Sequence, residues 1–228
     1  MGSARLADIR QAIEPSGLVL RGGFSPVSGD GVPTMRGGSE CASLVLLGNI
    51  GGSIWPAFSA SPEMGDGRPH GLDRWTRRII DSVADRLGAE ALYPFGGPPS
   101  FPFQRWAQRA EPVAPSPIGI LIHPDHGLWH AYRGALAFAS ALDLPAMKPH
   151  SRPCDSCVER PCLTACPVAA FKPEGYDVAA CRRHVASAAG QTCREGGCLA
   201  RLACPVGRAL AYPPAEMGFH MAAFLSAL

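Results

Sequence analysis

Cysteine is the residue type whose number and spacing in this sequence most directly indicate chemistry. The chain has 228 residues and nine cysteines, and eight of the nine fall between residues 154 and 204. The first group is Cys154, Cys157, Cys162 and Cys166, and the second group is Cys181, Cys193, Cys198 and Cys204. Each group ends in a Cys-Pro dipeptide. Thiolates bind metals, and the reducing, cytoplasmic setting that we expect disfavours disulfides, so the pattern indicates metal ligands.

Zinc and iron–sulfur clusters are the two kinds of group that these cysteines could hold. Structural zinc sites usually show two C-x2-C pairs, whereas only one such pair, Cys154 and Cys157, occurs here. A [4Fe–4S] cubane needs one thiolate at each iron corner, and eight cysteines supply two cubanes with no remainder. The Cys-Pro endings also favour two [4Fe–4S] clusters. Cys41 stands apart at the start of an apolar stretch, and we interpret it as a buried structural thiol.

The first cysteine run resembles that of bacterial ferredoxins, C-x2-C-x2-C-x3-C-P, in which the fourth ligand of each cluster comes from the other Cys-Pro run. The resemblance implies that Cys204 completes one cluster and that Cys166 belongs to the other. One ligand set is then Cys154, Cys157, Cys162 and Cys204, and the other is Cys166, Cys181, Cys193 and Cys198. The second gap of the run is x4 here instead of x2, and this departure affects the pairing more than the cluster type.

The composition describes a globular chain with little net charge. Hydrophobic residues make up 46% of it, the formal net charge is +2, and no block of basic residues indicates a nucleic-acid-binding face. The longest apolar runs, at 43–50 and 118–122, are far shorter than the roughly 20 residues that span a bilayer. Charges near the N-terminus fall where a signal peptide needs an apolar stretch. We therefore expect a cytoplasmic protein without a membrane or nucleic-acid partner.

Hydrophobic periodicity predicts a mixed α/β domain before the cysteines. Residues 72–87 form the clearest helix, with Gly88 as its C-terminal cap. The apolar stripe of this helix is Leu72, Trp75, Ile79, Val83 and Leu87. Residues 43–50 and 118–122 are continuously apolar, which predicts strands that are buried on both faces.

The remaining segments are shorter or ambiguous. Helices are expected at 4–15 and 104–110, and a strand is expected at 91–95. Residues 130–139 fit a strand or a helix equally well. Three prolines between residues 144 and 153 predict a linker, which divides the chain into a domain at 1–149 and a cysteine-rich module at 150–228.

Three histidines follow the apolar run at 118–122. His123 comes directly after it, and either a buried core histidine or a ligand contact fits that position. His126 and His130 are interpreted as surface loop residues, with a role in a binding pocket as the alternative.

The stretch "IHPDHGLWHAYRGALAF" (122–138) resembles the signature of the cobalamin-processing CblC family, and the Pro-rich 144–150 is similar to the segment that follows it there. The residues that match the signature are His123, Gly127, Trp129, Arg133 and Gly134. The resemblance implies a nitroreductase/flavin-reductase-like α/β sheet domain that binds cobalamin base-off. It also places His123 near the corrin, with Trp129 and Arg133 supporting the strand and loop.

The cysteine-rich module resembles that of other enzymes. The stretch 154–184 is similar to the first cysteine run of epoxyqueuosine reductase, which joins a related domain to a ferredoxin-like two-cluster module, and reductive dehalogenases share this combination. The chain is too short after Cys204 for the tRNA-binding helical repeats of epoxyqueuosine reductases, so we expect no tRNA partner.

These observations lead to one main functional hypothesis and several alternatives. The main hypothesis is a cobalamin reductase that removes the upper ligand, for example cyanide, from a corrinoid. Its electrons would reach two [4Fe–4S] clusters from a donor such as a flavodoxin or a ferredoxin reductase. The alternatives are a ferredoxin-type electron carrier, an epoxyqueuosine-reductase-like enzyme, and a variant of the same fold that binds FMN or FAD.

Overall fold

The computed structural model describes residues 5–147 and 150–226, which form two compact units. The sheet unit comprises Met1–Pro112 and His130–Pro149, and the cysteine unit comprises Val113–Trp129 and His150–Leu228. The boundary that the sequence predicts after residue 149 adjoins residues 148–149, which lie outside the described residues, so it stays a prediction. Residues 113–129, which we assigned to the N-terminal domain, belong to the cysteine unit instead.

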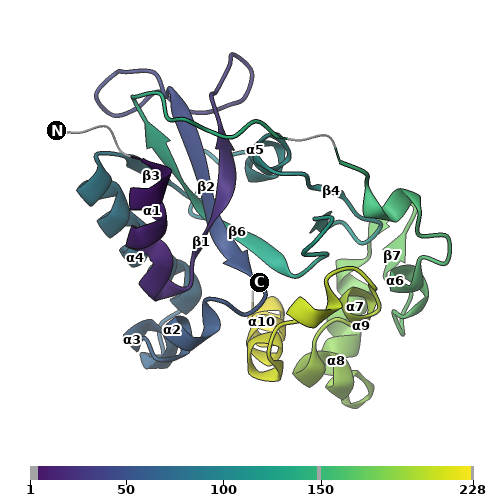
Figure 1. The fold of residues 1–228 in the computed structure, drawn as a ribbon. Helices are drawn as coiled ribbons and strands as arrows, with labels where there is room; N and C mark the ends of the chain where they lie inside the picture. Colours follow the sequence, from purple (N-terminus) through teal and green to yellow (C-terminus); the bar gives the residue numbers. More distant parts are fainter. Residues whose placement is uncertain (1–4, 148–149, 227–228) are drawn as a thin grey trace. The chain divides into compact units, whose positions relative to one another are not determined.

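A four-stranded antiparallel sheet forms the centre of the sheet unit (Figure 1). Its order is β1 (Val19–Phe24), β2 (Ser43–Ile50), β6 (His130–Phe138) and β3 (Glu90–Leu92). Seven of the eight residues of β2 are buried, which confirms the prediction of a strand that is buried on both faces. The ambiguous stretch 130–139 is a strand because it pairs with β2 along its whole length, from Ser43↔Phe138 to Ile50↔His130. The α/β fold class is confirmed.

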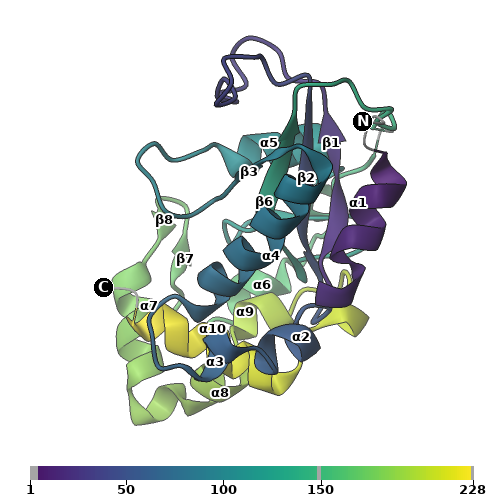
Figure 2. The same cartoon turned by 90° about the vertical axis from the view of Figure 1, so that its left-hand side faces the viewer.

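Helices cover both faces of this sheet. Figures 1 and 2 show α1 (Leu6–Ile13) and α4 (Gly71–Leu87) on one face and α5 (Phe103–Ala110) on the other. A short 3-10 helix, η1 (Glu14–Ser16), and two short α-helices, α2 (Trp55–Ser59) and α3 (Pro62–Gly65), complete the unit. The helices predicted at 4–15, 72–87 and 104–110 are therefore present, with bounds that differ by a few residues.

The buried face of α4 is rotated slightly about the helix axis from the apolar stripe that the sequence predicts. Ile80 is fully buried, whereas Ile79 and Leu87 are only half-buried. The helix also buries Thr76 and Ala84, so its contact face is wider than a single apolar row. Gly88 ends the helix with φ 66°, as expected for a left-handed cap.

The cysteine unit consists of short elements. Its strands are β4 (Ala114–Pro115), β5 (Leu121–Ile122), β7 (Phe171–Lys172) and β8 (Gly175–Tyr176). Its α-helices are α6 (Pro161–Thr164), α7 (Val178–Ala186), α8 (Gln191–Gly196), α9 (Leu199–Leu202) and α10 (Pro214–Ser226), and its 3-10 helices are η2 (Pro153–Asp155), η3 (Ala188–Gly190) and η4 (Arg208–Leu210). Within residues 5–147 and 150–226, no helix is long and apolar enough to cross a membrane.

Two predicted strands are shorter than expected. The segment 118–122 contributes only Leu121 and Ile122 to a strand, because Gly119 has φ 81° and its N–H donates to the Ser116 carbonyl in a turn (3.0 Å). Ile120 in this turn is exposed, so the prediction of a buried strand over the whole segment is wrong. The strand expected at 91–95 is the three-residue β3, and Tyr93 lies beyond its end.

A buried charge pair lies where the chain leaves and re-enters the sheet unit. Arg21 is fully buried, and its guanidinium donates to both carboxylate oxygens of Glu111 (2.9 and 2.6 Å). Tyr132 donates to the same carboxylate (2.7 Å), and the Arg21 guanidinium lies 3.2 Å from Nδ1 of His130. Glu111 precedes the 113–129 segment and His130 follows it. The network around Arg21 therefore links the two parts of the sheet unit that flank this segment.

Replacing Arg21 by methionine should destabilise the sheet unit by about 3–5 kcal/mol, because the Glu111 carboxylate would stay buried without its cation. Arg74→Met is the matched control, because Arg74 pairs with Asp66 (2.7 Å) at a solvent-accessible site where ion pairs contribute little to stability. Chemical denaturation followed by tryptophan fluorescence measures both free energies of unfolding. Equal losses in the two variants would contradict this role of Arg21.

Candidate metal centres

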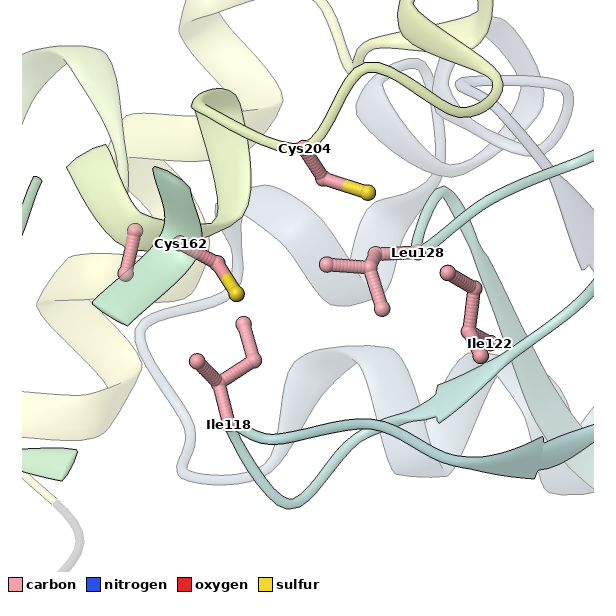
Figure 3. Close-up of a cluster of buried hydrophobic side chains, with 6 residues drawn as sticks. Ile118, Ile122, Leu128, Cys162 and Cys204 are labelled. Atoms are coloured by element: carbon pink, nitrogen blue, oxygen red, sulfur yellow. The ribbon is translucent and has the colours of Figure 1, made fainter. Parts of the chain in front are cut away.

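Four cysteines from separate parts of the sequence surround a first cavity in the cysteine unit. They are Cys154, Cys157, Cys162 and Cys204. Cys154 lies in η2 and Cys162 in α6, and Cys204 follows α9. Figure 3 shows Cys162 and Cys204 beside Ile118, Ile122 and Leu128, with which they form one apolar cluster. One wall of the cavity is therefore aliphatic and comes from the 113–129 segment.

The other four cysteines surround a second cavity in the same unit. They are Cys166, Cys181, Cys193 and Cys198. Phe171, Tyr176, Met221 and Phe224 complete an aromatic and apolar lining, to which His184 adds a ring. The backbone N–H of Ala170 donates to Sγ of Cys166 (3.3 Å).

The linings of the two cavities divide the eight cysteines into two sets of four, and the ferredoxin-like pairing of ligands stays a prediction. The unusual x4 gap is accommodated outside the first cavity. Val158 in this gap is 93% exposed, and Arg160 takes a left-handed conformation (φ 41°) directly before α6 begins. The extra residues therefore bulge into solvent, and Cys162 still faces the cavity.

Burial makes these thiols hard to ionise on their own. In the first set, burial and then the negative charge of neighbouring thiolates raise the pKa values of Cys154 and Cys162, and burial likewise raises the pKa of Cys204. In the second set, burial raises the pKa values of Cys193 and Cys198. A bound metal deprotonates its thiol ligands, so it would offset this cost.

The residues around the first cavity fit an iron–sulfur cluster. Four thiols face it, and the hydroxyl oxygen of Ser116 is buried in its wall without a hydrogen-bond partner among the residues that the structure describes. A buried hydroxyl without a partner costs about 1–3 kcal/mol, so a group with acceptor atoms is expected in the cavity. Within the described ranges, no three His, Cys, Asp or Glu side chains converge on the position of a single metal ion.

The His123–Gly127 turn packs against the chain that follows Cys204. His123 and Gly127 exchange two backbone hydrogen bonds of 2.9 Å, and Nδ1 of His123 accepts from the backbone N–H groups of Asp125 and His126 (3.0 and 3.3 Å). Gly127 has φ 57°, and a Cβ there would lie 1.9 Å from the carbonyl oxygen of Val206. Gly127 is therefore required by a close approach of two backbones.

Arg201 stabilises the same region and was not recognised in the sequence. It lies between Cys198 and Cys204, and its guanidinium donates twice to the Leu128 carbonyl (3.1 and 2.5 Å). The guanidinium also stacks on the rings of Trp129 (4.4 Å) and Tyr212 (4.5 Å), which fixes α9 against the end of the 113–129 segment. The sequence feature that could have identified Arg201 is its position inside the second cysteine group.

The five residues that match the CblC signature are divided between the two units. His123, Gly127 and Trp129 belong to the cysteine unit, whereas Arg133 and Gly134 belong to β6 of the sheet unit. Arg133 donates to the Asn49 side chain (3.2 Å), and a Cβ on Gly134 would lie 2.7 Å from Ile80. Local packing accounts for Gly127, Trp129 and Gly134 without a bound cofactor.

The other residues considered in the sequence have simpler roles. His130 is buried as the first residue of β6, so its interpretation as a surface loop residue is wrong, whereas His126 is half-buried and stacks on His123 (ring centroids 4.1 Å apart). Cys41 is buried in the sheet unit, where burial raises the pKa of its thiol, which donates to the Ser43 carbonyl (3.2 Å). This environment is that of a structural thiol.

Solved structures with the same fold are epoxyqueuosine reductases. A selenomethionine-labelled epoxyqueuosine reductase matches 93% of this chain and 68% of its own, with a TM-score of 0.55 and 14% identity. A second, solved with an epoxyqueuosine-modified tRNA-Tyr stem loop, matches 92% of this chain and 68% of its own (TM-score 0.51, 14% identity). The enzyme from Bacillus subtilis matches 91% and 66% (TM-score 0.52, 14% identity). No family model and no curated protein matches the sequence.

These comparisons establish the fold and revise two expectations. Nearly the whole described chain follows the fold of these epoxyqueuosine reductases. The resemblance of residues 122–138 to the CblC family gains no support. The expectation of no nucleic-acid partner conflicts with one of these neighbours, which was solved with a tRNA stem loop.

Replacing Gly127 by alanine should destabilise the cysteine unit by roughly 3 kcal/mol or more, because the new Cβ meets the Val206 carbonyl and φ is positive. Gly119→Ala is the matched control, since Gly119 also has positive φ (81°) but nothing within 4 Å of its Cβ position, and about 1–2 kcal/mol is expected there. Thermal unfolding of the anaerobic proteins compares the two. Similar losses would show that the contact with Val206 is absent.

Proposed function

We propose that the chain is an iron–sulfur oxidoreductase that holds two [4Fe–4S] clusters. Cys154, Cys157, Cys162 and Cys204 would bind one cluster, and Cys166, Cys181, Cys193 and Cys198 would bind the other. The observation that carries the proposal is the arrangement of these cysteines in two rings of four, each around its own cavity. The fold of the epoxyqueuosine reductases supports it.

The cavity inside each ring favours a cubane over zinc. Tetrahedral zinc with bonds of about 2.3 Å brings its sulfurs within about 3.8 Å of one another and leaves no cavity between them. A cubane binds each thiolate at a different iron corner, so it occupies the space that the four thiols surround. The N–H group of Ala170, which donates to Cys166, would also stabilise a thiolate ligand.

The protein residues around the clusters have clear tasks in this proposal. Ile118, Ile122 and Leu128 exclude water from one side of the first cavity, and Phe171 and Phe224 do so at the second. When bound, each cluster exchanges one electron at a time, so the pair supplies the two electrons of a typical organic reduction. Arg201 and the His123–Gly127 turn hold the cysteine-bearing segment around Cys198 and Cys204 in place.

For the substrate we propose an epoxide on a tRNA nucleoside, as in the proteins of the same fold. Conversion of an epoxide to an alkene consumes two electrons and two protons, breaks two C–O bonds and releases water. The electrons would come from an external donor such as a flavodoxin. The likeness to epoxyqueuosine reductases, one of them solved with a modified tRNA stem loop, is what supports this substrate class.

The anaerobic protein should convert an epoxyqueuosine-containing tRNA-Tyr stem loop to its alkene product when a low-potential reductant is supplied. Mass spectrometry of the digested RNA measures the loss of one oxygen, in parallel reactions with and without added cobalamin. Cyanocobalamin alone serves as the competing substrate. Cyanide release without RNA reduction would favour cobalamin processing, and neither reaction with intact clusters would leave an electron carrier.

Cys162→Ala and Cys193→Ala should each lower the bound iron by half, because each removes one corner ligand of a different cluster. Cys41→Ala is the matched control, since Cys41 lies in the sheet unit and should leave the iron content unchanged. Iron and acid-labile sulfide are counted in anaerobically purified protein. Equal iron loss in all three variants, or full iron content in all three, would be inconsistent with the proposed ligand sets.

A further inference from the structure

Ser116 lies in the wall of the first cavity, although it comes from outside the cysteine-rich sequence. It belongs to the turn between β4 and β5, which pair through Ala114↔Ile122 and Pro115↔Leu121. The backbone of Ser116 is fixed on both sides, since its N–H donates to the Ile120 carbonyl and its carbonyl accepts from the N–H of Gly119 (both 3.0 Å). Its hydroxyl takes no part in this turn.

The environment of this hydroxyl offers it one kind of acceptor. The oxygen is buried and has no hydrogen-bond partner among residues 5–147 and 150–226. The other side chains that line the cavity are cysteines, prolines, aliphatic residues and Arg160. Proline and aliphatic side chains have no acceptor, and a guanidinium only donates, so sulfur atoms are the only other acceptors among the side chains that line the cavity.

We propose that Ser116 donates a hydrogen bond to a sulfur of the cluster held by Cys154, Cys157, Cys162 and Cys204, and thereby raises its reduction potential. The inference rests on the proposed function, because it requires that cluster. Hydrogen bonds to cluster sulfurs stabilise the reduced form, which is one charge more negative, and they are one of the protein's means of setting the potential. Ser116 is a tuning residue in this sense and not a metal ligand.

Ser116→Ala should lower the potential of this cluster and leave the other cluster unchanged. We expect the one-electron reduction equilibrium to weaken by about tenfold, which corresponds to about 59 mV. Ser116→Thr keeps the hydroxyl and should retain the wild-type potential. Ser156→Ala is the matched control, because Ser156 is exposed beside Cys157 and its hydroxyl already donates to the Pro153 carbonyl (3.3 Å).

Redox titration followed by electron paramagnetic resonance measures both potentials, with the two signals assigned from Cys162→Ala and Cys193→Ala. Pulsed measurements should also detect an exchangeable proton coupled to the first cluster, which Ser116→Ala removes and Ser156→Ala retains. Unchanged potential and coupling in Ser116→Ala, with both clusters present, would overturn the inference alone. Equal shifts in the alanine and threonine variants would assign the effect to packing and also overturn it. Wild-type protein without clusters would overturn the proposed function as well.

Discussion

Keeping four buried or half-buried thiols together around each cavity is the constraint on which the cysteine unit depends. Burial and mutual repulsion raise the pKa of Cys154 and Cys162, and burial has the same effect on Cys193, Cys198 and Cys204. The proximity of the thiols is therefore unfavourable until a bound metal group deprotonates them. The cysteine unit consists mostly of short helices and turns. Their positions keep the two rings of cysteines in place.

The segment 113–129 helps to keep the thiols of the first cavity together, although it lies outside the cysteine-rich sequence. It gives the first cavity its aliphatic wall through Ile118, Ile122 and Leu128, and it packs its glycine turn against the backbone after Cys204. Arg201 then fixes the end of the segment through the Leu128 carbonyl and the Trp129 ring. Within the sheet unit, the buried Arg21 network links Glu111, just before this segment, to His130, just after it.

Local sequence patterns predicted the parts of the molecule that local forces determine. The strand at 43–50 and the helix at 72–87 follow from hydrophobic periodicity. The patterns failed where distant segments meet. Gly127 is needed because of Val206, His130 is buried because β6 pairs with β2, and Ser116 reaches a cavity formed by residues far along the chain. No spacing rule within residues 113–130 could reveal these contacts.

Mössbauer spectroscopy of the anaerobic, 57Fe-enriched protein, with iron and sulfide counted in the same sample, tests the central claim most directly. Two cubanes predict eight irons and eight sulfides per chain and spectra of [4Fe–4S] clusters alone. Stoichiometric zinc, or iron without acid-labile sulfide, would contradict the assignment of the two cysteine rings and the oxidoreductase function derived from it.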